Sequence, residues 1–182
     1  MGRYAARKAA AYAKASAEPA VDRKQVEAEK ARAYRPIKQS KNGVGWKELN
    51  YAIARVMQDY CGKYKNERTL NRGLSLLREL QDNEGATAYA ANPHELGRTL
   101  ECFSLMTLGE MVMQASLARK CSSAYLDFYR LDYPQMDPPE WEKHLPMRRE
   151  NGRVAVRELP LDFHLRAPYA SSYEENYERH AH

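Results

Sequence analysis

The sequence lacks the features that mark membrane proteins, secreted proteins and nucleotide-binding enzymes. No apolar run approaches the length of a membrane span, and the start, AARKAAAYAKASA, has no apolar core of a secretory signal. A glycine-rich phosphate loop and a Gly-x-Ser-x-Gly elbow are both missing. We therefore expect a cytoplasmic chain with no direct membrane span. An organellar transit peptide is the alternative that the Ala- and Arg-rich start leaves open.

Cysteine and histidine are too scattered to predict a disulfide framework, a metal centre or a catalytic group. The sequence has three cysteines: Cys61, Cys102 and Cys121. They show no CxxC or CxxH spacing, which favours reduced, buried thiols. His144 and His164 lie near carboxylates, where a histidine can act as a base, but neither has a nucleophile nearby or a partner histidine at metal-ligand spacing. The sequence thus predicts no catalytic residue and no metal site.

The charge of the chain is modest and mixed in sign. With 182 residues, a formal net charge of +5 and a mean hydropathy of −0.78, a polar single domain with a real core is expected. In the basic N-terminal part, Asp22, Glu27 and Glu29 alternate with lysines and arginines instead of leaving one positive face. This pattern argues against nucleic acid as a partner.

Apolar residues recur every three or four positions over residues 46–121, which predicts three helices. On the first helix, one face carries Trp46, Leu49, Ile53, Val56, Met57 and Tyr60. On the second helix, one face carries Leu70, Leu74, Leu77 and Leu80. Short polar connections join the helices, so the expected fold class is mainly α, with a three-helix up-down-up bundle.

The third helix of this bundle has the strongest start signal. Asn92 is expected as its N-cap, Pro93 as its first residue and Glu95 as its third. Its middle, FSLMTLGEMVM, is apolar on nearly all sides, which predicts a central helix surrounded by others. Glu110 within it could be a buried acid with a raised pKa, but a partner arginine on another helix is the favoured interpretation.

Less regular segments flank the bundle. Residues 1–45 are predicted to form an Ala-rich helix and then a charged linker that holds a short helix. Residues 122–182 are predicted to begin with an extended strap, RLDYPQMDPPEWEKH, because its prolines fix φ and remove backbone donors. A short β-hairpin with Asn151 and Gly152 in its turn follows, and then an extended, tyrosine-rich arm.

The order of these pieces resembles the C-terminal helical domain of the flavoprotein subunits of succinate dehydrogenase, fumarate reductase and adenylylsulfate reductase. That family follows a long helix with an Ala-Arg-Lys-Glu-Ser-Arg element and an Arg-x-Asp-aromatic-Pro strap. The matching residues are Ala118, Arg119, Lys120, Ser122, Arg130, Asp132, Tyr133, Pro134, Asp137 and Trp141. Cys121 stands where the family has Glu, and Ser123 stands where it has Arg. The segment YLDFYRLDYPQMD is closer to the adenylylsulfate reductase or fumarate-reductase-like branch.

The resemblance implies a C-terminal helical portion of an FAD-dependent oxidoreductase, as a split subunit or an excised fragment. The family's FAD-binding and substrate-handling residues precede this portion, so FAD belongs to the complete flavoprotein, and this chain alone is expected to bind no cofactor and to catalyse nothing. Its implied partners are the FAD-binding portion and an iron–sulfur or other electron-transfer subunit, with membrane association only through them. The expected docking surface consists of Arg119, Arg130, Tyr133, Pro134 and Trp141. The alternative is a free-standing helical protein-interaction module without any flavin connection.

Overall fold

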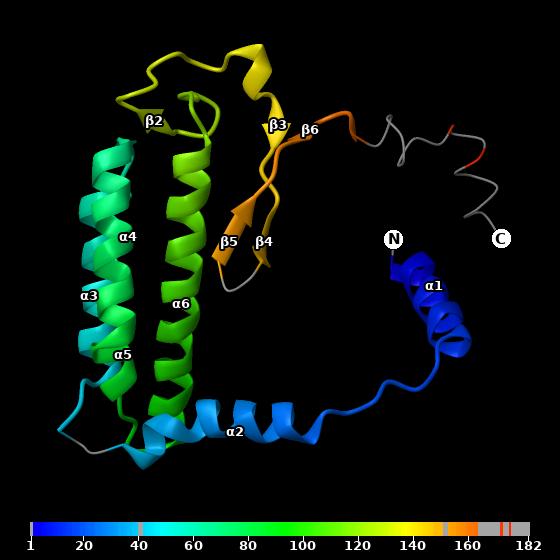
Figure 1. Ribbon diagram of the computed structural model, residues 1–182, viewed down its shortest axis with the longest axis vertical. Coiled ribbons are helices and arrows are strands. Elements are labelled where there is room, and N and C mark those ends of the chain that lie inside the picture. The colour runs from blue at the N-terminus through cyan, green and yellow to red at the C-terminus, as the bar shows by residue number, and fades with distance from the viewer. Residues whose placement is uncertain (1, 40–41, 151–152, 164–171, 173–174, 176–182) are drawn as a thin grey trace. The chain divides into compact units, whose positions relative to one another are not determined.

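The computed structural model describes residues 2–39, 42–150, 153–163, 172 and 175 (Figure 1). The chain divides into two compact units, of which the larger is Lys30–Leu161. The smaller unit contains the Ala-rich helix that the sequence predicts, α1 (Gly2–Ala15). No side chain of α1 is buried, and its alanines favour the helix without tertiary contacts.

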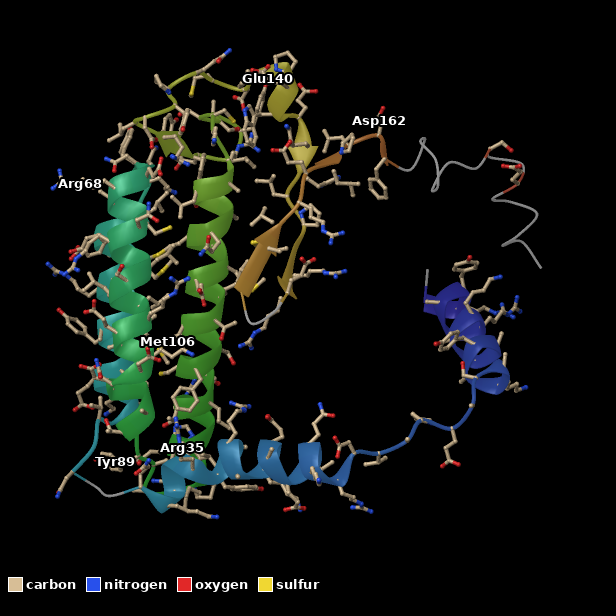
Figure 2. All side chains as sticks on the ribbon, viewed as in Figure 1. Arg35, Arg68, Tyr89, Met106, Glu140 and Asp162 are labelled. Carbon is tan, nitrogen blue, oxygen red and sulfur yellow. The ribbon has the colours of Figure 1, made fainter. Side chains whose placement is uncertain are left out.

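Three helices form the predicted up-down-up bundle of the larger unit. They are α3 (Trp46–Tyr60), α4 (Glu67–Asp82) and α6 (Pro93–Ala118), and each packs against the other two (Figure 1). The buried apolar side chains between them are Leu49, Ile53, Leu70, Leu74, Leu77, Cys102, Met106 and Met113. Met106 points into the space between α4 and α6 (Figure 2). The mainly α fold class is confirmed.

Local side-chain contacts fix where the helices begin. Asn92 is the N-cap of α6, as predicted, and its side chain accepts a hydrogen bond from the Glu95 amide at 3.0 Å. Glu95 in turn accepts from the Ala91 amide at 2.7 Å. Asn66 caps α4 in the same way, within a capping box completed by Thr69. These caps satisfy amide groups that have no partner inside the helix.

The charged helix of the N-terminal region, α2 (Arg23–Lys38), extends further than the sequence predicts. Pro36 lies inside the last turn of α2 and is buried. It removes one helical hydrogen bond, and the helix ends two residues later. The Pro36 carbonyl accepts from the Ala90 amide at 2.9 Å, and Arg35 Nη2 donates to the Gly85 carbonyl of the short helix α5 (Glu84–Thr87) at 2.9 Å. The end of α2 is therefore attached to α5 and to the connection between α5 and α6.

The predicted central helix, α6, is surrounded by other elements except along one face. It packs mainly against α3, α4 and the hairpin strand β5, and its N-terminal half also meets Arg35 of α2 and Gly85 of α5. Leu105, Leu108 and Val112 remain 41%, 54% and 40% exposed. Apolar residues on every side of a helix show that each face can be buried, but this chain covers only part of the circumference. We call these three residues the α6 outer face.

Short strands complete the larger unit. The predicted hairpin is confirmed in its strands, β4 (Met147–Glu150) and β5 (Arg153–Val156), which pair antiparallel with Met147 opposite Val156. Its turn at Asn151 and Gly152, and most of the predicted C-terminal arm, lie outside the described residues. Two pairs were not predicted: β1 (Tyr64–Lys65) with β2 (Tyr129–Arg130), and β3 (Lys143–His144) with β6 (Leu159–Pro160). A short 3-10 turn, η1 (Pro139–Trp141), precedes β3.

Two glycines of the bundle should respond oppositely to alanine. A Cβ on Gly73 would lie 2.6 Å from Tyr60 Cβ and 2.9 Å from Met113 Cε, so Gly73→Ala should destabilise by about 1–3 kcal/mol. A Cβ on Gly97 would meet nothing within 4 Å, so Gly97→Ala should stabilise by about 0.5–1 kcal/mol. Urea unfolding of both variants checks the signs. Equal shifts would contradict the close approach of α4 to its neighbours.

Candidate docking site at the junction of helix α6 and the strap

Arg130, the first residue of the strap (residues 130–144), lies at the centre of this junction. Its side chain is 1% exposed. Nη1 donates to the Ser116 carbonyl, to the Leu117 carbonyl at 3.4 Å and to the Arg119 carbonyl at 2.9 Å. These carbonyls end α6, where they have no helical partner and carry the negative end of the helix dipole. The guanidinium therefore caps α6 from a distant part of the chain.

Asp132 connects the same guanidinium to a second helix. Arg130 Nε and Nη2 each donate to one oxygen of the Asp132 carboxylate at 2.8 Å, which is the bidentate geometry of a strong ion pair. Asp132 Oδ2 also accepts from the Glu67 amide, in the first turn of α4, at 2.8 Å. Hydrogen bonding from Arg130 lowers the Asp132 pKa from 3.8 to about 2. The pair thus joins the C-terminus of α6 to the N-terminus of α4.

The burial of Arg130 removes this residue from the expected docking surface. Arg130 lies beneath the surface, with a side chain that is 1% exposed, and all three guanidinium nitrogens donate within the chain. A partner protein therefore cannot reach its guanidinium. The Asp132 side chain is 27% exposed, so only the arginine of this pair is buried. Removing Arg130 would leave the carbonyls that end α6 without their partner. Arg130 therefore positions the strap and does not form its outer surface.

Ser122 fixes the path of the strap beyond Arg130. Its hydroxyl accepts from the Arg130 amide at 2.9 Å and donates to the Tyr133 carbonyl at 3.0 Å. Its backbone accepts from the Asp137 amide at 3.0 Å and donates to the Gln135 carbonyl at 2.9 Å. A single residue just after α6 consequently holds the first half of the strap, from Arg130 to Asp137.

The other four expected docking residues reach the surface. Pro134 is exposed, and Tyr133 is half-buried with its ring 4.9 Å from the Arg130 guanidinium. Trp141 is half-buried, with Lys143 Nζ 4.5 Å and the Arg119 guanidinium 5.9 Å from its ring centroid. Arg119 Nε is buried and has no hydrogen-bond partner within the described residues. These four side chains form the strap surface.

A buried lysine and a cysteine lie behind the strap. Lys65 places its ammonium 4.5 Å from the Phe128 ring centroid, and burial lowers its pKa, with repulsion from Arg130 in the same direction. Burial likewise raises the pKa of the Cys61 thiol. The site therefore disfavours a second cation beside the Arg130 guanidinium, and the contact with the Phe128 ring compensates the Lys65 charge only in part.

Sequence reasoning missed a second surface, an apolar groove between α3 and α6. The groove has a volume of about 250 Å³, and α3 contributes Ile53, Ala54 and Met57 to it. The α6 outer face forms the opposite side. The sequence does contain a signal for this groove, since the middle of α6 carries apolar residues on nearly all sides. Such a pattern predicts burial within the chain equally well.

Glu110, the acid inside α6, has the partner that the sequence predicts. Arg78 of α4 donates to its carboxylate from Nη2 at 2.8 Å and from Nε at 3.2 Å. The carboxylate is thus part of a structural ion pair between α4 and α6. Across the described ranges, no three His, Cys, Asp or Glu side chains come together in a way that could hold a metal ion.

The described residues do not fit an FAD diphosphate. Its usual cradle is a strand, a glycine-rich turn and a helix N-terminus, whereas the strands described here have two to four residues and form isolated pairs. We assign no flavin chemistry to these residues.

None of the helices in the described part of the chain combines the length and the hydrophobicity that a membrane span requires.

Comparison with known families identifies the fold. The family described as "Fumarate reductase flavoprotein C-term" matches residues 50–173, which include the bundle, the strap and the hairpin. The chain belongs to this family. Residues 50–173 make up more than half of the chain. The match confirms the resemblance drawn from the strap and the helix before it.

Individual relatives agree with this assignment. The fumarate reductase flavoprotein subunit of Haemophilus influenzae is 25% identical over 121 residues, which are 64% of this chain and 20% of that protein. Adenylylsulfate reductase from Archaeoglobus fulgidus superposes with a TM-score of 0.73 at 22% identity, over 79% of this chain and 25% of that one. Mycobacterium smegmatis Sdh1 gives 0.72 at 21%, over 84% and 26%. The chain therefore spans about a fifth to a quarter of these flavoproteins.

The junction of this flavoprotein C-terminal domain should lose stability in acid. The folded-state pKa of Asp132 is depressed, so its contribution is complete above the ordinary value of 3.8 and is lost as the pH falls toward about 2. Asp132→Asn should lower the melting temperature at neutral pH, and its difference from wild type should shrink across this window. Asp59→Asn, which breaks the exposed pair with Arg55, is the control and should change little. A constant difference between Asp132→Asn and wild type down to pH 2 would contradict the ion pair.

Proposed function

We propose that the chain is the C-terminal helical part of an FAD-dependent oxidoreductase of the fumarate reductase and adenylylsulfate reductase type, and that it completes the flavoprotein by docking onto the FAD-binding portion. The observation that carries this proposal is family membership over residues 50–173 in a chain that spans only 20% of its curated relative. The remaining four fifths of such a protein must contact this domain somewhere.

The α6 outer face is the first contact that we assign. Leu105, Leu108 and Val112 are about half exposed and line a groove together with α3. Covering the exposed half of each side chain is worth about 1 kcal/mol. Aliphatic side chains beside a shallow groove are typical of an interaction surface. We assign the FAD-binding portion as the polypeptide that covers them.

The strap surface is the second contact, formed by Arg119, Tyr133, Pro134 and Trp141. Its backbone is already held by Arg130 and by Ser122, so docking orders little further chain. A half-buried tryptophan approached by two cations offers an aromatic anchor of the kind that dominates interfaces. Arg119 is half-buried, so the exposed part of its guanidinium can pair with a carboxylate of the partner.

Cofactor and location follow from this assignment. FAD is held by the docked portion, and the chain alone neither binds flavin nor catalyses a reaction. An iron–sulfur or other electron-transfer subunit contacts the completed flavoprotein, and any membrane association runs through such partners. A cytoplasmic location is supported by Cys102 and Cys121, which are buried, separate thiols without a disulfide.

Association with the FAD-binding portion, supplied as a separate polypeptide, tests the proposal. Leu108→Glu should weaken the association at least about tenfold, because it places a charge in the apolar groove. Tyr51→Glu is the matched control: Tyr51 is 70% exposed on α3 but does not line the groove. Sedimentation velocity gives both dissociation constants, and thermal melting of the chain alone shows that each variant still folds.

Trp141→Ala separates the proposal from a self-sufficient module. If the strap surface docks, this truncation should weaken association by about 2 kcal/mol and change the melting temperature little. A large loss of stability with unchanged association would contradict docking through the strap. If wild type and FAD-binding portion do not associate at all, the chain is a free-standing module and the proposal fails.

A further inference from the structure

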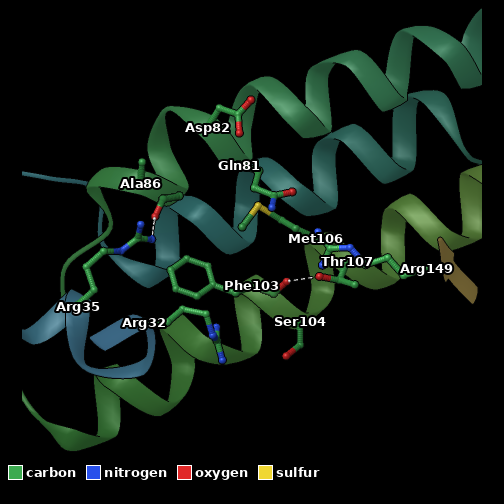
Figure 3. A pocket seen from close by; sticks show the side chains of 11 residues that line it. Arg32, Arg35, Gln81, Asp82, Ala86, Phe103, Ser104, Met106, Thr107 and Arg149 are labelled. Atoms are coloured by element: carbon green, nitrogen blue, oxygen red, sulfur yellow. Dashed lines mark hydrogen bonds between the residues drawn. The ribbon is translucent and has the colours of Figure 1, made fainter. Parts of the chain in front are cut away.

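A cleft with three arginines lies on the side of the bundle that faces the hairpin. It has a volume of about 630 Å³, within the range of small-ligand sites. Its walls come from the C-terminal part of α2, the α4–α5 corner, α6 and β4 (Figure 3). Arg32 and Arg35 lie on either side of the Phe103 ring, and Arg149 lies across the cleft beyond Thr107 (Figure 3). Asp82 is the single carboxylate in the lining.

Arg35 is positioned by neutral groups. Its Nη2 donates to the Gly85 carbonyl at 2.9 Å, and its guanidinium lies 5.7 Å from the centroid of the Phe103 ring. These contacts orient the guanidinium but leave its positive charge uncompensated. A guanidinium fixed in this way loses little freedom when it binds an anion.

Arg149 is directed into the cleft by the pairing of the hairpin. Alternate residues of a strand share a face, and Met147 packs toward α6 beside Met111 and Val154. Arg149 is therefore on the face directed at the bundle, and within the described ranges it makes no ion pair. Its neighbour Arg148 pairs with Glu150 at 2.6 Å. Arg148 thus has a carboxylate, which it shares with Arg157, whereas Arg149 lines the cleft without one.

The cleft also offers neutral hydrogen-bonding groups. Ser104 and Thr107 line it with hydroxyl oxygens, and Gln81 contributes an amide. The apolar floor, Phe103 and Met106, excludes water from one side and strengthens the field of the arginines. Arg35 and Arg149 thus bring two positive charges to the lining, against the one carboxylate of Asp82.

We propose that this cleft binds a small polyvalent oxyanion of the phosphate type. Guanidinium groups on opposite walls suit a ligand with two anionic ends, because each planar fork can bind two oxygens. Walls from α2, the α4–α5 corner, α6 and β4 surround a volume of about 630 Å³, which suits a small molecule better than an extended acidic segment. The cleft shares no lining residue with the α6 outer face or the strap surface. Its anion binding can therefore be tested independently of the docking proposal.

Calorimetric titration of the full chain with inorganic pyrophosphate at fixed ionic strength tests the site. Arg149→Gln and Arg35→Gln should each raise the dissociation constant at least about tenfold, because each removes a charge-assisted contact. Arg148→Gln is the matched control, with the same charge change one residue away, and should leave the constant unchanged. Arg149 lies on the hairpin, so its substitution leaves the bundle core intact, which thermal melting verifies.

Three results would overturn the proposal. One is the absence of pyrophosphate binding by the wild-type chain. A second is equal weakening by Arg148→Gln and Arg149→Gln, which would indicate general attraction to a basic chain. The third is binding of a hexaglutamate peptide without binding of pyrophosphate, which would assign the arginines to an acidic protein partner. None of these results bears on association with the FAD-binding portion.

Discussion

One buried guanidinium joins two helix termini at the same end of the bundle to the segment that follows α6. Arg130 donates to the last carbonyls of α6 and to Asp132, and Asp132 accepts from the first turn of α4. The positive charge lies at a helix C-terminus and the carboxylate at a helix N-terminus, so both groups complement the helix dipoles. Arg130 is the last residue of β2, paired with Lys65 of β1, and the first residue of the strap, so the pairing of β1 with β2 and the path of the strap both pass through this contact.

The residues that stabilise the domain differ from the residues that are exposed for contact with a partner. The bundle buries its apolar side chains between α3, α4 and α6, with close approach at Gly73 and Gly109, where a Cβ would lie 3.0 Å or less from a neighbouring side chain. One side of α6 and the outer edge of the strap remain uncovered by the described residues. A domain with a complete core and an uncovered apolar face is suited to docking as a preformed body, with little ordering left to do.

Periodicity and capping chemistry predicted the helices well because both are local. The N-cap at Asn92, the three-helix bundle and the pairing of Glu110 with an arginine of another helix were all predicted. Two questions needed tertiary information: which face of α6 remains uncovered, and whether Arg130 lies on or under the surface. The Arg-x-Asp spacing was a signal of local pairing, but it was interpreted as part of a docking surface. The two-residue strands and the arginine cleft left no pattern in the sequence, since their members come from distant segments.

Native-state hydrogen exchange tests most directly whether Arg130 makes the bundle and the strap one cooperative unit. The decisive amides are those of Glu67, which donates to Asp132 at 2.8 Å, and Leu131, which donates to the Lys65 carbonyl at 2.8 Å. The reference amides are those of Leu74 and Leu77 in the core of α4. If the junction holds the unit together, all four should exchange with opening free energies within about 1 kcal/mol of global unfolding. Rapid exchange at Glu67 and Leu131 beside a protected α4 core would contradict the central role of Arg130.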